Sequence, residues 1–253
     1  MTTALAAMVS ILAATAAAEP TGETPGMHLF ILSGQSNMAG LDADAFFTPL
    51  VAETLGADRV IVVKDALSGQ PIQRWYKAWK APDGSSPRKT GDLYEALMAK
   101  VRAAADGKSV QTVTFVWMQG ERDARESWGD VYADSLKGLV AQLRRDLGRD
   151  DVNVVIGRLS DFDLAGEKYP HWTKVRDAQV AVAKADARAA WIDTDDLNGE
   201  KNDLHYVKPA GYKLLGKRFA EKSLDLVRTL KATPGVLKIA PRIEPASSGL
   251  HQP

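Results

Sequence analysis

Short apolar runs alternate with helical patterns along this chain, and this alternation limits its fold more than any other feature. Five runs rich in Val, Ile, Phe and Trp predict strands at 29–32, 60–63, 113–118, 152–156 and 189–192. Between them, apolar residues recur at helical spacing, as in the stripe of Leu136, Val140, Leu143 and Leu147. Asp92 and Ser127 are the predicted N-caps of two of these helices. Strands joined by helices predict a five-stranded parallel sheet in a three-layer α/β/α sandwich.

The composition excludes several functions. Lys and Arg number 32, as do Asp and Glu, so no net charge favours nucleic acid or a membrane surface, and we expect neither as a partner. The chain has no cysteine, which excludes cysteine nucleophiles, disulfides and thiolate metal sites. The sequence makes no prediction about oligomeric state.

The two ends of the chain differ from its middle. Residues 4–18 are small or apolar and end in three alanines, which predicts a signal peptide over 1–18 and a secreted or periplasmic protein. The start departs from the usual pattern, because Met1-Thr2-Thr3 carries no positive charge. We expect a linker at 19–26, the folded domain at 27–232 and a poorly packed C-terminal extension at 233–253.

A serine at the end of the first predicted strand is the leading candidate for chemistry. Ser36 lies in the turn Gly34-Gln35-Ser36-Asn37, and ligands of open α/β sheets bind at such strand ends. His205 follows the fifth strand at the same edge, two residues after Asp203. A serine, a histidine and a carboxylate are the set needed for nucleophilic catalysis. From these residues alone, the alternative for Ser36 is a helix N-cap, which a lone Gly-x-Ser favours, and the alternative for His205 is a surface histidine.

Two other strand ends offer hydrogen-bond donors. The Gln119 amide and the Gly69 backbone N–H could stabilise an oxyanion, or they could belong to ordinary turns. Glu121 could be the acid or the partner of an arginine such as Arg176.

Five blocks, in order over residues 29–220, carry a family resemblance: GQSNM, SGQPIQRW, WMQGE, HWTKVRDAQ and NDLHYVKPAGYKLLGKRFA. They resemble the SGNH (GDSL-like) hydrolases, and within these the sialate O-acetylesterase and carbohydrate esterase family 6 group, which includes acetylxylan esterases. The resemblance implies a flavodoxin-like sandwich with no metal or organic cofactor.

The resemblance also implies roles for single residues. Ser36 would be the nucleophile and His205 the general base, and the N–H groups of Ser36 and Gly69 would form the oxyanion hole with the Gln119 side chain. Many relatives have Asp three residues before the histidine, where this chain has Asn202. The Asp-x-His pattern keeps Asp203 as the expected acid, with Glu121 in reserve.

We therefore expect an exported carbohydrate O-acetylesterase that deacetylates xylan-type or sialic-acid-type glycans through an acetyl-serine. The alternatives are a general or lipid acyl esterase and a catalytically dead carbohydrate-binding scaffold. An anion-binding turn over 34–40 ranks last, because the P-loop lysine and the Gly-x-Gly-x-x-Gly spacing are missing. Aromatic faces suit sugar rings but also serve as buried surface, and the candidate substrate contacts are Gln35, Trp75, Trp79, Trp128 and Tyr206.

Overall fold

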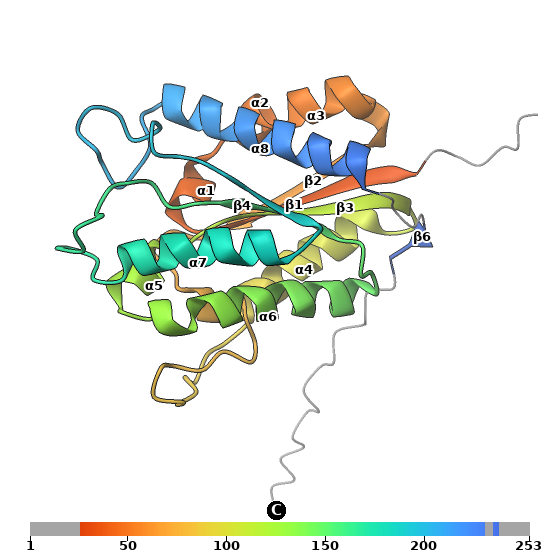
Figure 1. Cartoon of the computed structure of the whole chain (residues 1–253). Helices are drawn as coiled ribbons and strands as arrows, with labels where there is room; N and C mark the ends of the chain where they lie inside the picture. The colour runs from red at the N-terminus through yellow and green to blue at the C-terminus, as the bar shows by residue number, and fades with distance from the viewer. Residues whose placement is uncertain (1–25, 231–234, 238–253) are drawn as a thin grey trace, which may run out of the picture.

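Five parallel strands form the central sheet of a computed structural model that describes residues 26–230 and 235–237 (Figure 1). The sheet order is β2-β1-β3-β4-β5. The strands are β1 (Met27–Gly34), β2 (Val60–Ala66), β3 (Ser109–Met118), β4 (Asn153–Gly157) and β5 (Ala189–Ile192). Each overlaps one of the five predicted runs, so the predicted parallel sheet is confirmed. A short strand that was not predicted, β6 (Gly235–Val236), pairs antiparallel with β3 from within the expected C-terminal extension.

Helices cover both faces of the sheet, which confirms the three-layer sandwich (Figure 1). One face carries α4 (Asp92–Ala105), α5 (Glu121–Arg125), α6 (Gly129–Leu147) and α7 (Trp172–Ala185). The other carries α2 (Ala43–Phe46), α3 (Thr48–Leu55) and α8 (Ala210–Thr229). The remaining short elements are α1 (Ser36–Gly40), η1 (Ala57–Arg59) and η2 (Ile72–Arg74). In the described part of the chain, no helix has the length and apolar character needed to cross a membrane.

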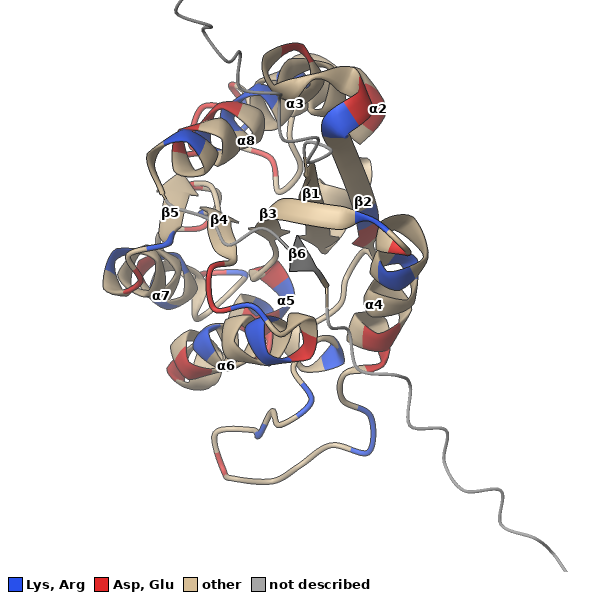
Figure 2. Ribbon diagram, turned by 90° about the vertical axis from the view of Figure 1, so that its right-hand side faces the viewer, with Lys and Arg blue, Asp and Glu red and all other residues tan. Residues whose placement is uncertain are grey.

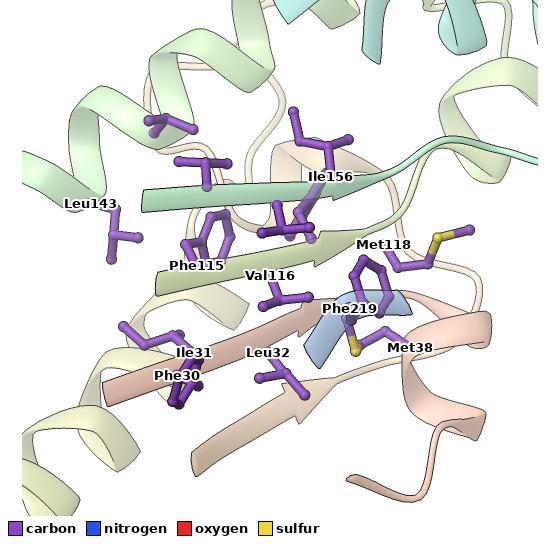
Figure 3. Close-up of a cluster of buried hydrophobic side chains, with 14 of the residues drawn as sticks. Phe30, Ile31, Leu32, Met38, Phe115, Val116, Met118, Leu143, Ile156 and Phe219 are labelled. Atoms are coloured by element: carbon purple, nitrogen blue, oxygen red, sulfur yellow. The ribbon is translucent and has the colours of Figure 1, made fainter. Parts of the chain in front are cut away.

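The strands are buried on both faces, as their nearly continuous apolar sequence requires. Figure 3 shows Phe30, Ile31 and Leu32 of β1 clustered with side chains of β3 and of the flanking helices. Phe30 packs edge-on against Phe47, with ring centroids 5.5 Å apart. Burial of each such side chain stabilises the fold by roughly 1.5–3 kcal/mol, so the central strands form a rigid base for the turns at their ends. On the outer faces of the helices, acidic and basic residues are interspersed (Figure 2).

Some helix starts differ from the sequence prediction. Ser127 was predicted as an N-cap, but its backbone is left-handed (φ 59°) and α6 starts two residues later, at Gly129. Asp92 was also predicted as an N-cap, but it is the first residue of α4, and Gly91 precedes it with a left-handed φ of 71°. These starts depend on tight turns that hydrophobic periodicity does not report.

The strand order positions the candidate site. β1 lies between β2 and β3, and Gly34 at its end is in register with Ala66 and with Met118. The segments that leave these three strands therefore emerge side by side at one edge of the sheet.

Candidate active site

The turn after β1 holds Ser36 against the neighbouring strand. Gly34 has a φ of +143°, and a Cβ there would overlap the carbonyl oxygen of Met118 in β3. The Gln35 N–H donates a 2.9 Å hydrogen bond to that same carbonyl. Because only glycine permits this close approach, the sequence Gly-x-Ser fixes Ser36 as the first, partly exposed residue of α1.

A cavity of about 330 Å³ at this edge gathers several of the predicted residues. Its lining comprises Gln35, Ser36, Ser68, Gly69, Glu121, Arg122, Arg125, Tyr169, Leu204 and His205. The predicted nucleophile, base and backbone donor, separated by up to 169 residues in sequence, thus share one space. A larger hollow of about 720 Å³ lies along α3, β5 and α8, but its lining has no histidine. The smaller cavity is therefore the candidate site, because its lining contains both a serine and a histidine.

Two backbone donors at the cavity wall are free to bind a substrate oxygen. Within the described residues, the N–H groups of Ser36 and Gly69 have no hydrogen-bond partner. Gly69 has a left-handed φ of +71°, and a Cβ there would meet no atom within 4 Å. Glycine is therefore favoured at this position by backbone conformation and not by lack of space. Unpaired N–H groups beside a serine hydroxyl can stabilise an oxyanion.

Gln119 does not donate into the cavity, contrary to its predicted role in the oxyanion hole. Its side chain is completely buried and does not line the cavity. Its Nε2 donates to Gln35 Oε1 at 3.1 Å, to the Gln70 carbonyl at 3.2 Å and to Asp123 Oδ2. These acceptors take up both N–H groups of the amide. Gln119 instead connects the residue before Ser36 to the residue after Gly69.

Glu121 is the carboxylate that lines the cavity. Its Oε1 accepts a 3.0 Å hydrogen bond from Asn37 Nδ2, and its buried Oε2 has no hydrogen-bond partner among the described residues. Burial raises the pKa of Glu121 to about 7. The alternative partner, Arg176, pairs with Asp195 at 2.7 Å, so the predicted Arg176 pairing is wrong.

Asp203, the expected acid, lies outside the cavity lining, whereas His205 belongs to it. Both residues are exposed. Among the described residues, no side-chain hydrogen bond of Asp203 is formed, including to His205. Of the two predicted acids, the structure therefore brings Glu121, and not Asp203, to the cavity that contains Ser36 and His205.

Asp123 is a buried residue that holds neighbouring segments of this site together, although no sequence motif pointed to it. It is completely buried, and its Oδ2 accepts hydrogen bonds from the Ile72 N–H at 2.9 Å and from Gln119. Burial raises the pKa of Asp123 to about 7. The only available signal was its position four residues after Gln119 in the chain.

Three of the four aromatic residues predicted to contact sugar belong to the core. Trp75 is 1% exposed and packs edge-on against Trp117 at 5.2 Å. Tyr206 packs against Tyr212, and Trp79 is also buried. Their large apolar surfaces are used in packing, which is the alternative that the sequence analysis gave for them.

The remaining predicted contacts have different outcomes. Trp128 is half-buried, packs against Trp79 at 4.9 Å and does not line the cavity. Gln35 lines the cavity, but its Oε1 accepts from Gln119 and from the Arg122 N–H at 3.2 Å. Tyr169, which was not predicted, is the aromatic residue in the lining.

Two arginines in the lining were also not predicted. Arg122 and Arg125 lie three residues apart on α5, a helix of only five residues that no periodic pattern indicated. Over residues 26–230 and 235–237, no three His, Asp or Glu side chains are grouped so that they could hold a metal ion.

Comparisons with known proteins agree with this chemistry. A family model described as carbohydrate esterase, sialic acid-specific acetylesterase matches residues 40–225, a span that includes Gly69, Glu121 and His205 and begins just after Ser36. No curated protein sequence matches the chain at a significant level.

Solved structures share the fold at low sequence identity. A protein from Arabidopsis thaliana is 20% identical and covers 79% of this chain and 99% of its own, with a TM-score of 0.60. A carbohydrate acetylesterase from Xanthomonas citri is 16% identical and covers 80% of this chain and 57% of its own, with a TM-score of 0.57. A carbohydrate acetylesterase from Sinorhizobium meliloti is 16% identical and covers 79% of this chain and 99% of its own, with a TM-score of 0.53.

The family match carries the assignment, because it spans most of the chain, whereas the structural neighbours establish the fold alone. The family description names an ester hydrolase, and the cavity holds side chains suited to that reaction. The chain therefore belongs to the sialic acid-specific acetylesterase family of carbohydrate esterases and is a carboxylic ester hydrolase.

Proposed function

We propose that this protein is a carbohydrate O-acetylesterase that works through an acetyl-serine intermediate on Ser36. The observation that carries the proposal is one cavity lined by the Ser36 hydroxyl, the His205 imidazole and two unpartnered backbone N–H groups. A serine hydroxyl is a weak nucleophile until a nearby base removes its proton, and a neutral imidazole suits that task. The family match supports acetylesterase activity in general.

The reaction would proceed in two halves. Ser36 Oγ attacks the acetyl carbonyl while His205 accepts the hydroxyl proton, and the resulting oxyanion accepts hydrogen bonds from the N–H groups of Ser36 and Gly69. The imidazolium then returns its proton to the departing sugar oxygen, which leaves the acetyl group on Ser36. In the second half, water activated by His205 attacks the acetyl-enzyme and releases acetate.

We assign the supporting carboxylate to Glu121 rather than to Asp203. Glu121 shares the cavity with the serine and the histidine, and its Oε2 has no hydrogen-bond partner in the described structure. An ionised carboxylate near the imidazolium stabilises the charge that forms when Ser36 loses its proton. Burial raises the pKa of Glu121 to about 7, so this stabilisation would be largest above neutral pH.

The lining favours a small acyl group over a lipid chain. Leu204 is the one aliphatic side chain in it, and apart from Gly69 the other residues are polar, charged or aromatic. A long acyl chain gains roughly 0.8 kcal/mol for each CH₂ that it buries, and Leu204 alone offers it an aliphatic side chain to bury against. Export remains a proposal from the pattern of residues 1–18, which lie outside the described residues.

Kinetics of serine variants on p-nitrophenyl acetate test the proposal. Ser36→Ala should lower kcat by at least about 10³-fold, because the nucleophile is lost. Ser68→Ala is the matched control, since Ser68 is the other serine in the lining, and it should retain most of the activity. The proposal fails if Ser36→Ala turns over the ester at a near-normal rate, or if Ser68→Ala is the inactive variant.

Acyl-chain and sugar series address the alternatives. The proposal predicts that kcat/KM falls from acetyl to octanoyl esters, whereas a lipid esterase would show a rise. Acetate release from acetylated xylan and from O-acetylated sialosides then distinguishes the two glycan types. A protein that binds glycans but neither releases acetate nor reacts with a serine-directed phosphonate would be a dead scaffold.

A further inference from the structure

Tyr169 is the one Phe, Tyr or Trp residue in the lining of the cavity beside Ser36. The aromatic residues that the sequence offered as sugar contacts are buried in the core or lie outside this lining. Tyr169 is instead partly exposed, and it shares the cavity with Ser36 and His205. The cavity measures about 330 Å³, so a residue in its wall is within reach of a sugar whose acetyl ester lies at Ser36.

Two neighbouring rings hold the side chain of Tyr169 in place. Phe162 and Trp172 pack nearly perpendicular to it, with ring centroids 5.6 and 5.3 Å away and interplanar angles of 79° and 74°. Trp172 is itself buried, and its indole N–H donates a 2.7 Å hydrogen bond to the Ser160 carbonyl. The ring of Tyr169 is therefore positioned by the fold, so little side-chain freedom remains to be lost when a ligand binds.

The backbone that carries Tyr169 is also fixed. Asp163 is buried, and its carboxyl accepts hydrogen bonds from three successive backbone N–H groups. Its Oδ1 accepts from Glu167 at 3.1 Å, and its Oδ2 accepts from Lys168 at 2.9 Å and from Tyr169 at 2.6 Å. The Tyr169 carbonyl in turn accepts from the Trp172 N–H at 2.9 Å. The segment between β4 and α7 thus presents Tyr169 on a rigid turn.

The hydroxyl of Tyr169 is free to bind a ligand. In the described part of the chain it forms no hydrogen bond, whereas the hydroxyls of the four buried tyrosines each donate one: Tyr94, Tyr132, Tyr206 and Tyr212. Tyr76 also lacks a partner there, but it does not line the cavity. A tyrosine combines an apolar ring with a hydroxyl that can donate or accept, and a sugar offers C–H groups on its ring face beside its own hydroxyls.

We propose that Tyr169 packs its ring against the sugar that carries the acetyl ester and that its hydroxyl binds a hydroxyl of the same sugar. This inference rests on the proposed function and assigns to Tyr169 the selection of sugar esters over esters of simple alcohols. A simple alcohol has neither the C–H face nor the neighbouring hydroxyl, so it gains nothing from these two contacts. Tyr169 takes no part in proton transfer, and its contribution is to bind and orient the substrate.

Acetyl esters with different alcohols test the proposal. A methyl O-acetylxyloside and a methyl O-acetylsialoside, each acetylated on the ring, are compared with ethyl acetate. Each kcat/KM is divided by the rate constant for hydroxide-catalysed hydrolysis of the same ester, which removes differences in intrinsic reactivity. For the better of the two sugar esters, the wild-type protein should then favour the sugar over ethyl acetate by about 30-fold or more.

Variants assign this preference to Tyr169. Tyr169→Ala should lower the sugar-over-ethyl acetate ratio about tenfold or more, and Tyr169→Phe, which keeps the ring, should lower it about threefold. The ratio does not depend on the folded fraction, because both esters report on the same active molecules. Tyr76→Ala removes a partly exposed tyrosine outside the lining and should leave the ratio unchanged. A wild-type ratio near one, or a ratio that Tyr169→Ala does not alter, overturns the inference.

Binding separates this inference from the proposed reaction. NMR titration with the deacetylated methyl xyloside and methyl sialoside measures the Kd for the sugar without turnover. At least one of them should bind wild-type and Ser36→Ala protein alike and bind Tyr169→Ala about tenfold more weakly. This result supports the sugar contact even if Ser36 is not the nucleophile. If neither glycoside binds, or if Tyr169→Ala leaves the Kd unchanged, the contact is contradicted, whatever the outcome for p-nitrophenyl acetate.

Discussion

Asn37 Nδ2 donates a 3.0 Å hydrogen bond to Oε1 of Glu121, and both side chains are buried. The same Asn37 amide reaches the chain on both sides of His205: its Nδ2 donates to the Leu204 carbonyl at 3.2 Å, and its Oδ1 accepts from the Tyr206 N–H at 3.4 Å. One side chain next to Ser36 therefore connects the three segments that carry the candidate nucleophile, base and acid.

Replacing Asn37 should disturb the site and the fold together. Asn37→Ala removes these hydrogen bonds and leaves buried partners unsatisfied, so the free energy of unfolding should fall by about 2–4 kcal/mol. Because His205 and Glu121 lose a shared support, kcat should fall more than KM rises. Tyr212→Phe removes only the 3.2 Å bond to Asn37 Oδ1 and should cost about 1 kcal/mol. Urea unfolding and ester kinetics on both variants test whether Asn37→Ala has the larger effect. Equal losses of stability and activity in the two variants would contradict this prediction.

The identity of the acid is open to a direct comparison. Glu121→Gln keeps the size of the side chain and removes its charge, and kcat/KM for p-nitrophenyl acetate should fall at least about 10²-fold. Asp203→Asn, at an exposed position outside the lining, should change it by a few-fold at most. If Asp203→Asn lost most of its kcat/KM while Glu121→Gln stayed active, the acid would be Asp203.

The buried carboxyl of Glu121 should make stability depend on pH. Its folded-state pKa of about 7 lies above the usual value of 4.5, so between these values only the folded protein holds the proton. Stability should therefore fall as pH rises from about 4.5 to 7, by up to about 3 kcal/mol from this group. Glu121→Gln cannot ionise and should lose less stability over that range. Thermal unfolding at pH 5 and pH 8 measures the difference, and parallel losses of Tm in both proteins would refute it.

Two glycines with different roles offer a matched pair. Gly34→Ala would place a Cβ on the Met118 carbonyl and should cost about 3 kcal/mol or more, or prevent folding. Gly69→Ala meets no neighbouring atom, so only its left-handed backbone is penalised, by about 1 kcal/mol. Expression level and urea midpoint distinguish them. Similar stability of the two variants would mean that the β1–β3 approach does not require glycine.

Much of the fold was predictable because buried parallel strands are nearly continuous apolar runs. The overlap of β1 and β3 with predicted runs follows from that burial on both faces. The shared location of Ser36, Gly69 and His205 was predictable for a related reason, since parallel strands deliver their ends to one edge.

The errors concern tertiary packing that no local pattern encodes. Gln119 was predicted as a free donor, but its amide donates to Gln35 and Gln70 from distant segments and to the nearby Asp123. Trp75 lies in a long polar-aromatic loop, yet it folds back onto Trp117 in the core. Arg125 was not predicted to line the cavity, because a five-residue helix such as α5 is too short to show a hydrophobic period.

Covalent trapping tests the central claim most directly. The full chain is incubated with a serine-directed phosphonate and examined by intact mass and peptide mapping. The account predicts one adduct, on Ser36, that is absent in Ser36→Ala and forms much more slowly in His205→Ala. An adduct on another residue, or no adduct in a protein that hydrolyses acetyl esters, would contradict Ser36 as the nucleophile.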